Sequence, residues 1–267
     1  MRVVALLAAY NEERFLAPCI EHLRAQGVHV YLIDNESSDR TVEIAEGYLG
    51  DGVIGIETLP RGEVFDWEAV LERKEQLAGE LDADWFIHHD ADEFRVSPRP
   101  GRTLLDELRE ADAAGHSAVN FMEFTFVPCA EEPDHDHERF LETMRWYYPL
   151  LPFYPYRLNA WKRQDAPVDL RGTGGHIVRF EGAEIAPRSL SMRHYLCLSP
   201  RHAVEKYVEK RYSEVEVAKG YHGWRARLRP ERIGFPPAAE LRVYRGDIWL
   251  DASRPRRREI FDDLVAA

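Results

Sequence analysis

Residues 85–94 read WFIHHDADEF, so an apolar run ends in two histidines and then three acids within four residues. Asp90 and Asp92 stand one residue apart, and two carboxylates at that spacing can surround a divalent ion, which prefers hard oxygen ligands. The small Ala91 between them leaves space for a diphosphate. A DxD triplet is also common in acidic turns and helix caps, so the triplet alone does not decide between a metal site and a turn.

The paired histidines, His88 and His89, suggest a second chemistry, because imidazole is a good zinc ligand. Neighbouring residues of a strand point to opposite faces of the sheet. Both side chains therefore cannot easily bind one ion. We expect one of them to lie buried beside the acidic residues and the other to have a structural role.

The first half of the chain alternates strand-like and helix-like patterns, which predicts an α/β fold with a Rossmann-like, mostly parallel sheet and helices on both faces. Apolar runs typical of buried strands cover residues 3–9, 28–33, 53–58, 85–89 and 118–127. Apolar residues at helical spacing predict helices over residues 15–23, 42–49, 66–81 and 103–114. Later in the chain, Ser199 is expected to cap one helix through residue 220, and the prolines of residues 146–161 are expected to exclude regular structure.

Polar residues follow three of the predicted strands. Tyr10, Asn11 and Glu12 come after the first strand, Asp34 after the second, and residues 88–93 end the fourth. In parallel α/β sheets, ligands bind at the carboxyl ends of the strands, near a change in strand order. Three separate segments therefore converge on one edge of the sheet, where we expect the binding site.

The segments AAYNEERFL, LIDNESSDRT and HHDADEF, in this order and at these separations, resemble the family 2-like glycosyltransferases, particularly the branch whose metal motif reads DADEF. The resemblance covers residues 1–130 well and implies the GT-A fold. It implies a nucleotide-sugar-binding α/β part at residues 1–130, and an acceptor-binding part with a C-terminal helical extension at residues 131–267, within one continuous domain.

The resemblance also implies roles at the nucleotide end of the site. Tyr10, Asn11 and Glu12 match the loop that touches the base and ribose of the nucleotide in such enzymes. Asp34 matches an acid that commonly accepts a hydrogen bond from a uracil imide. A UDP-linked sugar is therefore the expected donor.

At the diphosphate end, Asp90 and Asp92 match the motif that contacts ribose and ligates Mn²⁺ or Mg²⁺, with Asp92 the stronger metal candidate. His194, in RHYLCLS, resembles a late histidine that completes metal coordination in related enzymes; a hydrogen-bonded core histidine is the alternative. Arg73 or Lys74 lies near where related sequences place a cation that approaches the diphosphate, and we assign this role to Lys74.

A transferase also needs an acceptor site and often a base that removes a hydroxyl proton. Asp169 and His176 flank the glycine-rich sequence RGTGG, which can form an active-site loop. Glu123, in NFMEFTF, alternates with apolar neighbours and could face the pocket, or be a paired acid on a strand. We take these three residues as the candidate catalytic bases.

The composition limits the other classes of function. The chain has 267 residues, 45% of them hydrophobic, and a formal charge of −12, which argues against disorder and against nucleic-acid binding through a basic surface. Three widely spaced cysteines favour a reducing compartment. We expect a cytoplasmic protein that can contact a membrane surface through the aromatic residues of 146–161 or the tail RPRRRE.

Together these features predict a metal-dependent glycosyltransferase that moves a sugar from a nucleotide donor to a hydroxyl of a glycan, a lipid-linked sugar or a small molecule. One alternative is a sugar-phosphate nucleotidyltransferase, but AAYNEE stands where that class carries a GxGTR-like sequence. Another alternative is a metal- or sugar-binding scaffold without catalysis, which would not need Asp34, Asp90, Asp92 and His194 together.

Overall fold

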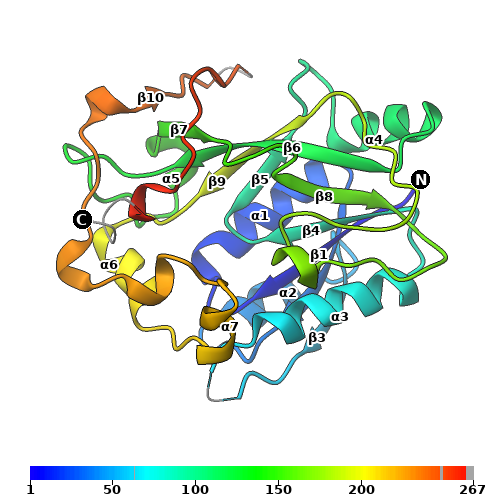
Figure 1. The fold of residues 1–267 in the computed structure, drawn as a ribbon, viewed down its shortest axis with the longest axis horizontal. Coiled ribbons are helices and arrows are strands. Elements are labelled where there is room, and N and C mark those ends of the chain that lie inside the picture. Colours follow the sequence, from blue (N-terminus) through cyan, green and yellow to red (C-terminus); the bar gives the residue numbers. More distant parts are fainter. Residues whose placement is uncertain (63, 247–248, 263–267) are drawn as a thin grey trace. The chain divides into compact units, whose positions relative to one another are not determined.

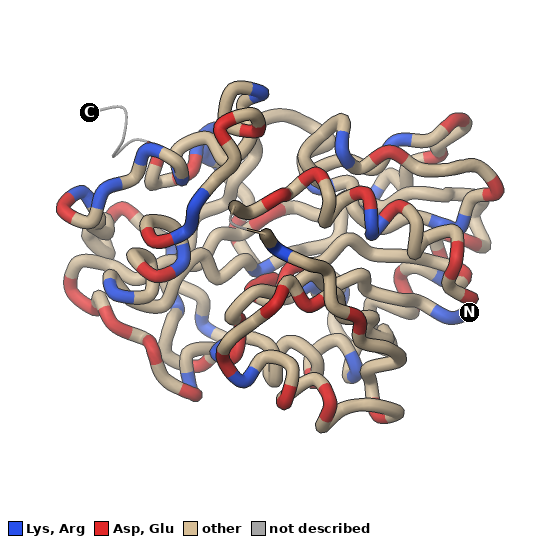
Figure 2. Tube along the Cα trace, turned by 90° about the horizontal axis from the view of Figure 1, so that it is seen from below, with Lys and Arg blue, Asp and Glu red and all other residues tan. Residues whose placement is uncertain are grey.

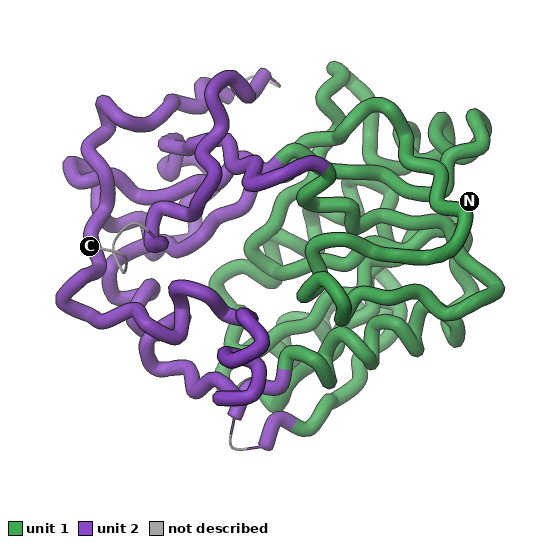
Figure 3. Tube along the Cα trace, viewed as in Figure 1, with its two compact units in different colours: residues 1–60, 67–122, 155–192 green, residues 61–66, 123–154, 193–267 purple. Residues whose placement is uncertain are grey.

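The structure is a computed structural model, and it describes residues 1–62, 64–246 and 249–262. The chain divides into two compact units, coloured separately in Figure 3. The first unit consists of residues 1–60, 67–122 and 155–192, and the second of residues 61–66, 123–154 and 193–267. The chain thus passes between the units several times.

The first unit is built around four parallel strands (Figure 1). β1 (Val3–Ala9) lies between β2 (His29–Asp34) and β4 (Trp85–Asp90), and β3 (Val53–Thr58) pairs with the outer side of β2. Because the strands run in the same direction, their carboxyl ends lie at one edge. The α/β class predicted from the alternating pattern is confirmed.

Antiparallel strands extend this sheet beyond β4. β8 (Arg157–Lys162) pairs with β4, and the first residues of β6 (Ala118–Phe126) pair with β8. The prolines of residues 146–161 were expected to exclude regular structure, so β8 was not predicted. β8 begins two residues after Pro155, the last proline of that segment, and its backbone donors are therefore available for pairing.

Helices cover both faces of the parallel strands, as predicted. His88 and His89 are neighbours on β4 and so point to opposite faces. His88 contacts α3 (Trp67–Glu80), and His89 contacts α1 (Glu13–Ala25). These contacts place the two helices on opposite sides of the sheet, and the main apolar core lies between α3, β1, β4 and β8.

The remaining elements of the first unit follow local sequence signals. α4 (Leu104–Ala113) begins with a capping box, in which Thr103 accepts from the Asp106 N–H and Asp106 accepts from the Thr103 N–H. α2 (Thr41–Glu46) ends three residues earlier than predicted, at Gly47, a poor helix former. The short strand β5 (Glu93–Val96) and the 3₁₀ turn η1 (Arg171–Thr173) complete the unit.

The second unit begins within β6. Here β6 pairs antiparallel with β7 (Trp146–Leu150), whose other side pairs with β10 (Arg242–Val243). Pro149 lies within β7, contrary to the expected loop. β10 pairs only with Trp146 and Tyr147; beyond it, the Pro149 carbonyl accepts from the Arg256 N–H and the Leu151 N–H donates to the Arg256 carbonyl, so this pairing requires no N–H from Pro149.

Aromatic stacking forms much of the core of the second unit. The Phe126 ring stacks on Tyr147 and on Tyr195, at centroid distances of 5.3 and 4.8 Å. Tyr195 ends β9 (Leu190–Tyr195). The aromatic residues of 146–161 therefore serve core packing in part, while Phe153 and Tyr154 stay exposed.

The single helix expected after Ser199 is wrong. Ser199 does cap a helix, α6 (Pro200–Ala203), but the chain continues as a π-helical turn, η2 (Val204–Val208), and α7 (Glu214–Ala218) begins separately. The Tyr207 hydroxyl donates to the Leu196 carbonyl, which holds the π turn against the preceding strand. The other short helices are α5 (Phe140–Thr143), η3 (Arg225–Arg227), η4 (Pro230–Arg232) and η5 (Ala238–Glu240).

Two surface properties bear on the predicted partners. Within the described part of the chain, none of the helices is long and apolar enough to cross a bilayer. Figure 2 shows acidic and basic residues interspersed along the trace.

Trp161 provides a test of the core. Its side chain is fully buried on β8 and packs near Phe86, with ring centroids 6.0 Å apart. Replacing Trp161 with alanine should lower the free energy of unfolding by about 3–5 kcal/mol, because a buried aromatic is lost and a cavity remains. Urea denaturation followed by circular dichroism measures this change. Trp249→Ala, at a side chain that is 75% exposed, is the control and should change stability little.

Candidate functional site

The carboxyl ends of β1, β2 and β4 bring the predicted polar segments together in the first unit. Asp34 is the register partner of Ala9, and Asp90 is the partner of Ala8. The two aspartates therefore flank the end of β1 on either side. The convergence expected from the sequence is what the strand pairing produces.

The turns after β1 and β2 are locked to each other by hydrogen bonds. Asn11 has a left-handed backbone (φ 56°), and its N–H donates to Ser37 Oγ at 2.9 Å. Asn11 Oδ1 accepts from the Ser38 N–H at 2.8 Å, and the Glu12 N–H donates to Thr41 Oγ1 at 2.8 Å. Asn11 thus has a structural function in this turn, and its contact with a nucleotide stays a prediction, as do those of Tyr10 and Glu12.

Asp34 is buried at the end of β2. Both of its carboxylate oxygens accept from the Ser37 N–H, at 3.1 and 3.3 Å. The neighbouring Asn35 donates through Nδ2 to the Leu59 carbonyl at 2.9 Å. These bonds fix the direction of the Asp34 carboxylate before any ligand arrives, which is a requirement for selective hydrogen bonding to a base.

The acidic turn between β4 and β5 differs in exposure from residue to residue. The Asp90 side chain is 40% exposed, whereas Asp92 and Glu93 are buried. The Asp90 N–H donates to Glu93 Oε2 at 3.2 Å, which closes the turn. Two carboxylates one residue apart, one of them accessible, fit the oxygen-donor preference of Mn²⁺ or Mg²⁺.

Lys74 lies fully buried behind this turn. Its Nζ is 3.8 Å from Asp90 Oδ1 and hydrogen-bonds to His88 Nδ1 and the His89 carbonyl, both at 3.1 Å. Burial lowers the pKa of Lys74 to about 8, against the opposing effect of the Asp90 and Glu93 charges. Arg73, the other cation considered, is turned to Glu57 and Glu80 instead. Lys74 therefore approaches the acidic turn from the protein interior. Its contact with a diphosphate stays a prediction.

Arg95 is a second buried cation, and no sequence motif predicts its role. Its guanidinium pairs with Glu93 at 2.6 Å, contacts His89 Nδ1, and lies 4.9 Å from the centre of the Phe121 ring. An NH2 donor also reaches Asn159 Oδ1 at 3.4 Å. Arg95 thus links the acidic turn to β6 and β8, which are distant in sequence.

The two histidines of β4 belong to different networks. His88 hydrogen-bonds to Lys74, while His89 Nε2 lies 3.4 Å from Cys19 Sγ on the other face. Burial lowers the pKa of both imidazoles well below the usual range, so both are neutral near pH 7. Their separation to opposite faces agrees with the argument against a shared zinc ion.

The glycine-rich loop with Asp169 and His176 belongs to the same unit. Asp169 Oδ1 accepts from the Gly172 N–H at 2.7 Å, and His176 Nδ1 lies 2.8 Å from an Arg157 nitrogen. Gly175 packs so closely on His88 that a Cβ there would lie 2.9 Å from the His88 Nε2 atom. The loop therefore reaches the polar network that underlies the acidic turn.

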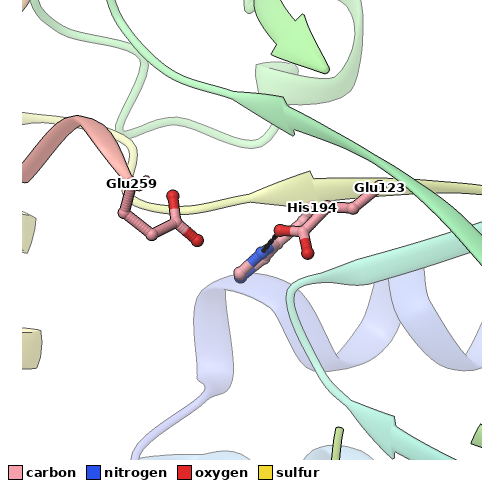
Figure 4. Close-up of side chains that lie close together, drawn as sticks. All are labelled: Glu123, His194 and Glu259. Atoms are coloured by element: carbon pink, nitrogen blue, oxygen red, sulfur yellow. Dashed lines mark hydrogen bonds and ion pairs between the residues drawn. The ribbon is translucent and has the colours of Figure 1, made fainter. Parts of the chain in front are cut away.

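The second unit contains a separate cluster of candidate residues. Glu123, on β6, is buried, and its Oε1 lies 2.7 Å from His194 Nδ1 on β9 and accepts from Thr125 Oγ1 at 3.2 Å. The carboxylate of Glu259 turns toward the same imidazole (Figure 4). Sequence reasoning gave Glu123 and His194 different functions and missed Glu259, which has no motif and follows four arginines in six residues.

The predicted metal ligands are divided between the units. Asp90 and Asp92 belong to the first unit and His194 to the second. The set of Asp90, Asp92 and His194 as ligands of one ion stays a prediction.

Comparison with known proteins identifies one family. Residues 5–94 match the family model described as Glycosyl transferase family 2, which confirms the resemblance carried by the three sequence motifs. Comparison with the curated proteins gave no match.

Among solved structures, similarity is found to S. aureus TarS 1-349. The TarS complex with UDP-GlcNAc is 15% identical with a TM-score of 0.34, covering 48% of this chain and 34% of that chain. The TarS complex with UDP is 12% identical with a TM-score of 0.46, covering 81% of this chain and 68% of that chain. A third TarS structure gives 12% identity, a TM-score of 0.42, and coverage of 78% and 63%. By the first of these matches, the chain spans about a third of the length of TarS 1-349.

Lys74 and Arg73 can be distinguished by mutation. If the chain binds UDP with Mn²⁺ as the sequence predicts, Lys74→Met should weaken that binding about ten- to hundredfold, since the loss of charge-assisted hydrogen bonds costs about 1.5–3 kcal/mol and Asp90 loses its buried partner. Isothermal titration measures the affinity. Arg73→Gln is the matched control and should leave it within about twofold, because partly exposed ion pairs contribute little. A greater loss in Arg73→Gln than in Lys74→Met would reverse the assignment.

Proposed function

We propose, from the match of residues 5–94 to the model of glycosyl transferase family 2, that the chain is a metal-dependent glycosyltransferase. It transfers a sugar from a UDP-linked donor to a hydroxyl of a glycan, a lipid-linked sugar or a small molecule. The observation that carries the proposal is the gathering of Asp34, Asp90 and Asp92 at the carboxyl edge of β1, β2 and β4, within the matched segment.

The nucleoside binds at the ends of β1 and β2. The Asp34 carboxylate accepts the uracil imide N–H, a function supported by its burial and by the fixed direction that the Ser37 N–H gives it. A buried acceptor that loses its donor is penalised, so this carboxylate selects bases with an N–H at that position. Tyr10 and Glu12, on the adjoining turn, contact the base and ribose.

The diphosphate binds beside the acidic turn. Asp90 and Asp92 would hold Mn²⁺ or Mg²⁺, and the chemistry that such an ion supplies when bound is neutralisation of charge on the departing diphosphate. The protein's own contribution is to hold the two carboxylates in place. Lys74 supports Asp90 from below, and Arg95 holds Glu93, which accepts from the Asp90 N–H.

The acceptor hydroxyl must lose a proton during transfer, and the hydrogen bonds rank the three predicted bases. Glu123 Oε1 already accepts a hydrogen bond from the Thr125 hydroxyl and lies within hydrogen-bond distance of His194 Nδ1, so this oxygen is engaged. His176 Nδ1 faces an arginine, which only donates, so the lone pair of that nitrogen is engaged. Asp169 is partly exposed and accepts one backbone hydrogen bond, which makes it the preferred base of the three.

Substitution of Asp92 tests the metal assignment. Asp92→Asn should abolish the Mn²⁺ dependence of UDP binding and leave the fold intact, because asparagine keeps the shape of the side chain but removes its charge. Titration of UDP with and without Mn²⁺ provides the measurement. Equal affinities in the variant and the wild type under both conditions would remove Asp92 from the metal site.

A nucleotide screen tests the donor. The melting temperature should rise with UDP plus Mn²⁺ and not with CDP, because cytosine lacks the imide N–H that Asp34 accepts; a ligand at about 100 times its dissociation constant stabilises by about 2.7 kcal/mol. GDP and dTDP, whose bases carry a ring N–H, complete the screen. Slow release of UDP from UDP-sugars should accompany this stabilisation. Binding of UDP with no release from any UDP-sugar would indicate a scaffold without catalysis.

A further inference from the structure

We propose that Glu123, His194 and Glu259 form a divalent-cation site within the second unit, in place of the predicted use of His194 as a ligand of an ion at Asp90 and Asp92. One ligand atom from each residue lies within 4.8 Å of the others (Figure 4). All three belong to the same unit, so their geometry is internal to it. The proposal concerns cation binding in the absence of nucleotide and does not require sugar transfer.

The backbone holds the first two ligands firmly. Glu123 and His194 come from β6 and β9, which pair with each other in the sheet. Both side chains are buried, at 1% and 5% exposure, so solvent contributes little to their solvation. Burying a carboxylate is expensive unless a cation or several donors compensate for the lost water.

The third ligand is brought in by the C-terminal segment. The Tyr148 hydroxyl donates to Glu259 Oε2 at 2.7 Å and itself accepts from the Ile260 N–H at 3.2 Å. Ile260 and Phe261, which directly follow Glu259, are buried and anchor the segment on that side of the interaction. Thr125 likewise donates to Glu123. Such hydrogen bonds orient carboxylate ligands.

The distances suit a small divalent ion. Ligand bonds of about 2.0–2.3 Å place two ligands of one ion roughly 3 Å apart at a right angle and about 4–4.6 Å apart across it. The observed spread of up to 4.8 Å therefore needs a contraction of a few tenths of an ångström, and the 2.7 Å contact between His194 and Glu123 needs a comparable opening.

The donor set also indicates the class of ion. Two carboxylates and one imidazole combine hard oxygen with a nitrogen ligand that Ca²⁺ and Mg²⁺ rarely use. Mn²⁺ and Zn²⁺ accept both kinds of ligand. Thr125 and Tyr148 are neutral donors that orient the two glutamates without adding charge, and a divalent ion would add positive charge at the same place.

Mn²⁺ titration of the whole, chelator-treated protein without nucleotide tests the site. Free Mn²⁺ is counted by electron paramagnetic resonance, with Zn²⁺ as competitor. Glu259→Gln and Glu123→Gln should each weaken this binding by more than about a hundredfold, since loss of an orienting partner alone costs about 10- to 100-fold. Tyr148→Phe should show that smaller loss. Glu231→Gln, at an exposed glutamate of the same unit, is the matched control and should bind as the wild type.

Three results would overturn the proposal. The wild type could bind no Mn²⁺ without nucleotide, Asp92→Asn could lose all of the Mn²⁺ binding, or both glutamine variants could keep it. A purely structural cluster also gives a distinct result: the melting temperature of metal-free Glu259→Gln would fall while its rise on adding Mn²⁺ stayed as in the wild type. If Glu259→Gln does not fold, the same comparison is made with Tyr148→Phe. Failure of UDP-sugar turnover with Mn²⁺ binding intact would count against the proposed transferase and not against this site.

Discussion

The placement of two fully buried cations beside an acidic turn is the constraint on which the first unit depends. Lys74 and Arg95 have no exposed surface, and a charge in that position persists only when carboxylates and hydrogen-bond acceptors replace water. Asp90 and Glu93 supply the negative charge, and the histidines of β4 and Asn159 supply acceptors. The turn and the cations therefore stabilise one another. The carboxylates of a candidate binding site thus also contribute to the stability of the fold.

This constraint explains how segments far apart in sequence are held next to one another. Arg95 reaches Asn159 on β8, whose Nδ2 donates to the Gly175 carbonyl at 3.1 Å. Gly175 packs directly on His88, and its left-handed backbone (φ +85°) suits a residue without a Cβ. The glycine-rich loop that carries Asp169 and His176 is thus fixed to the same network as the acidic turn, through backbone and amide groups that do not titrate.

The sequence was informative wherever a local pattern decided the structure. The apolar runs predicted the parallel strands, and apolar residues at helical spacing predicted α4, whose start the Thr103 capping box fixes in the structure. The sequence was uninformative where the local structure depends on contacts with residues that are distant in the chain. Pro149 occupies a strand because its outer neighbour, Arg256, needs only its carbonyl, and the helix after Ser199 is interrupted by a π turn that a hydrogen bond from Tyr207 holds to Leu196. Arg95 has no local motif, because its partners come from other elements of the sheet.

The site residues divide in the same way. Asp34, Asp90 and Asp92 follow strands, so their convergence could be predicted from topology alone, whereas the pairing of Glu123 with His194 needs the register of β6 with β9. In both units, buried carboxylates have lost contact with water and need other groups to compensate. The compensating groups differ between the units. In the first unit, side-chain cations offset the buried acids. In the second, the hydrogen bonds that Thr125 and Tyr148 donate to the two glutamates come from neutral groups, which set direction without supplying charge. The cation proposed for Glu123, His194 and Glu259 would add positive charge to a cluster that neutral donors orient, whereas the acids of the first unit have Lys74 and Arg95 as partners whether or not an ion binds.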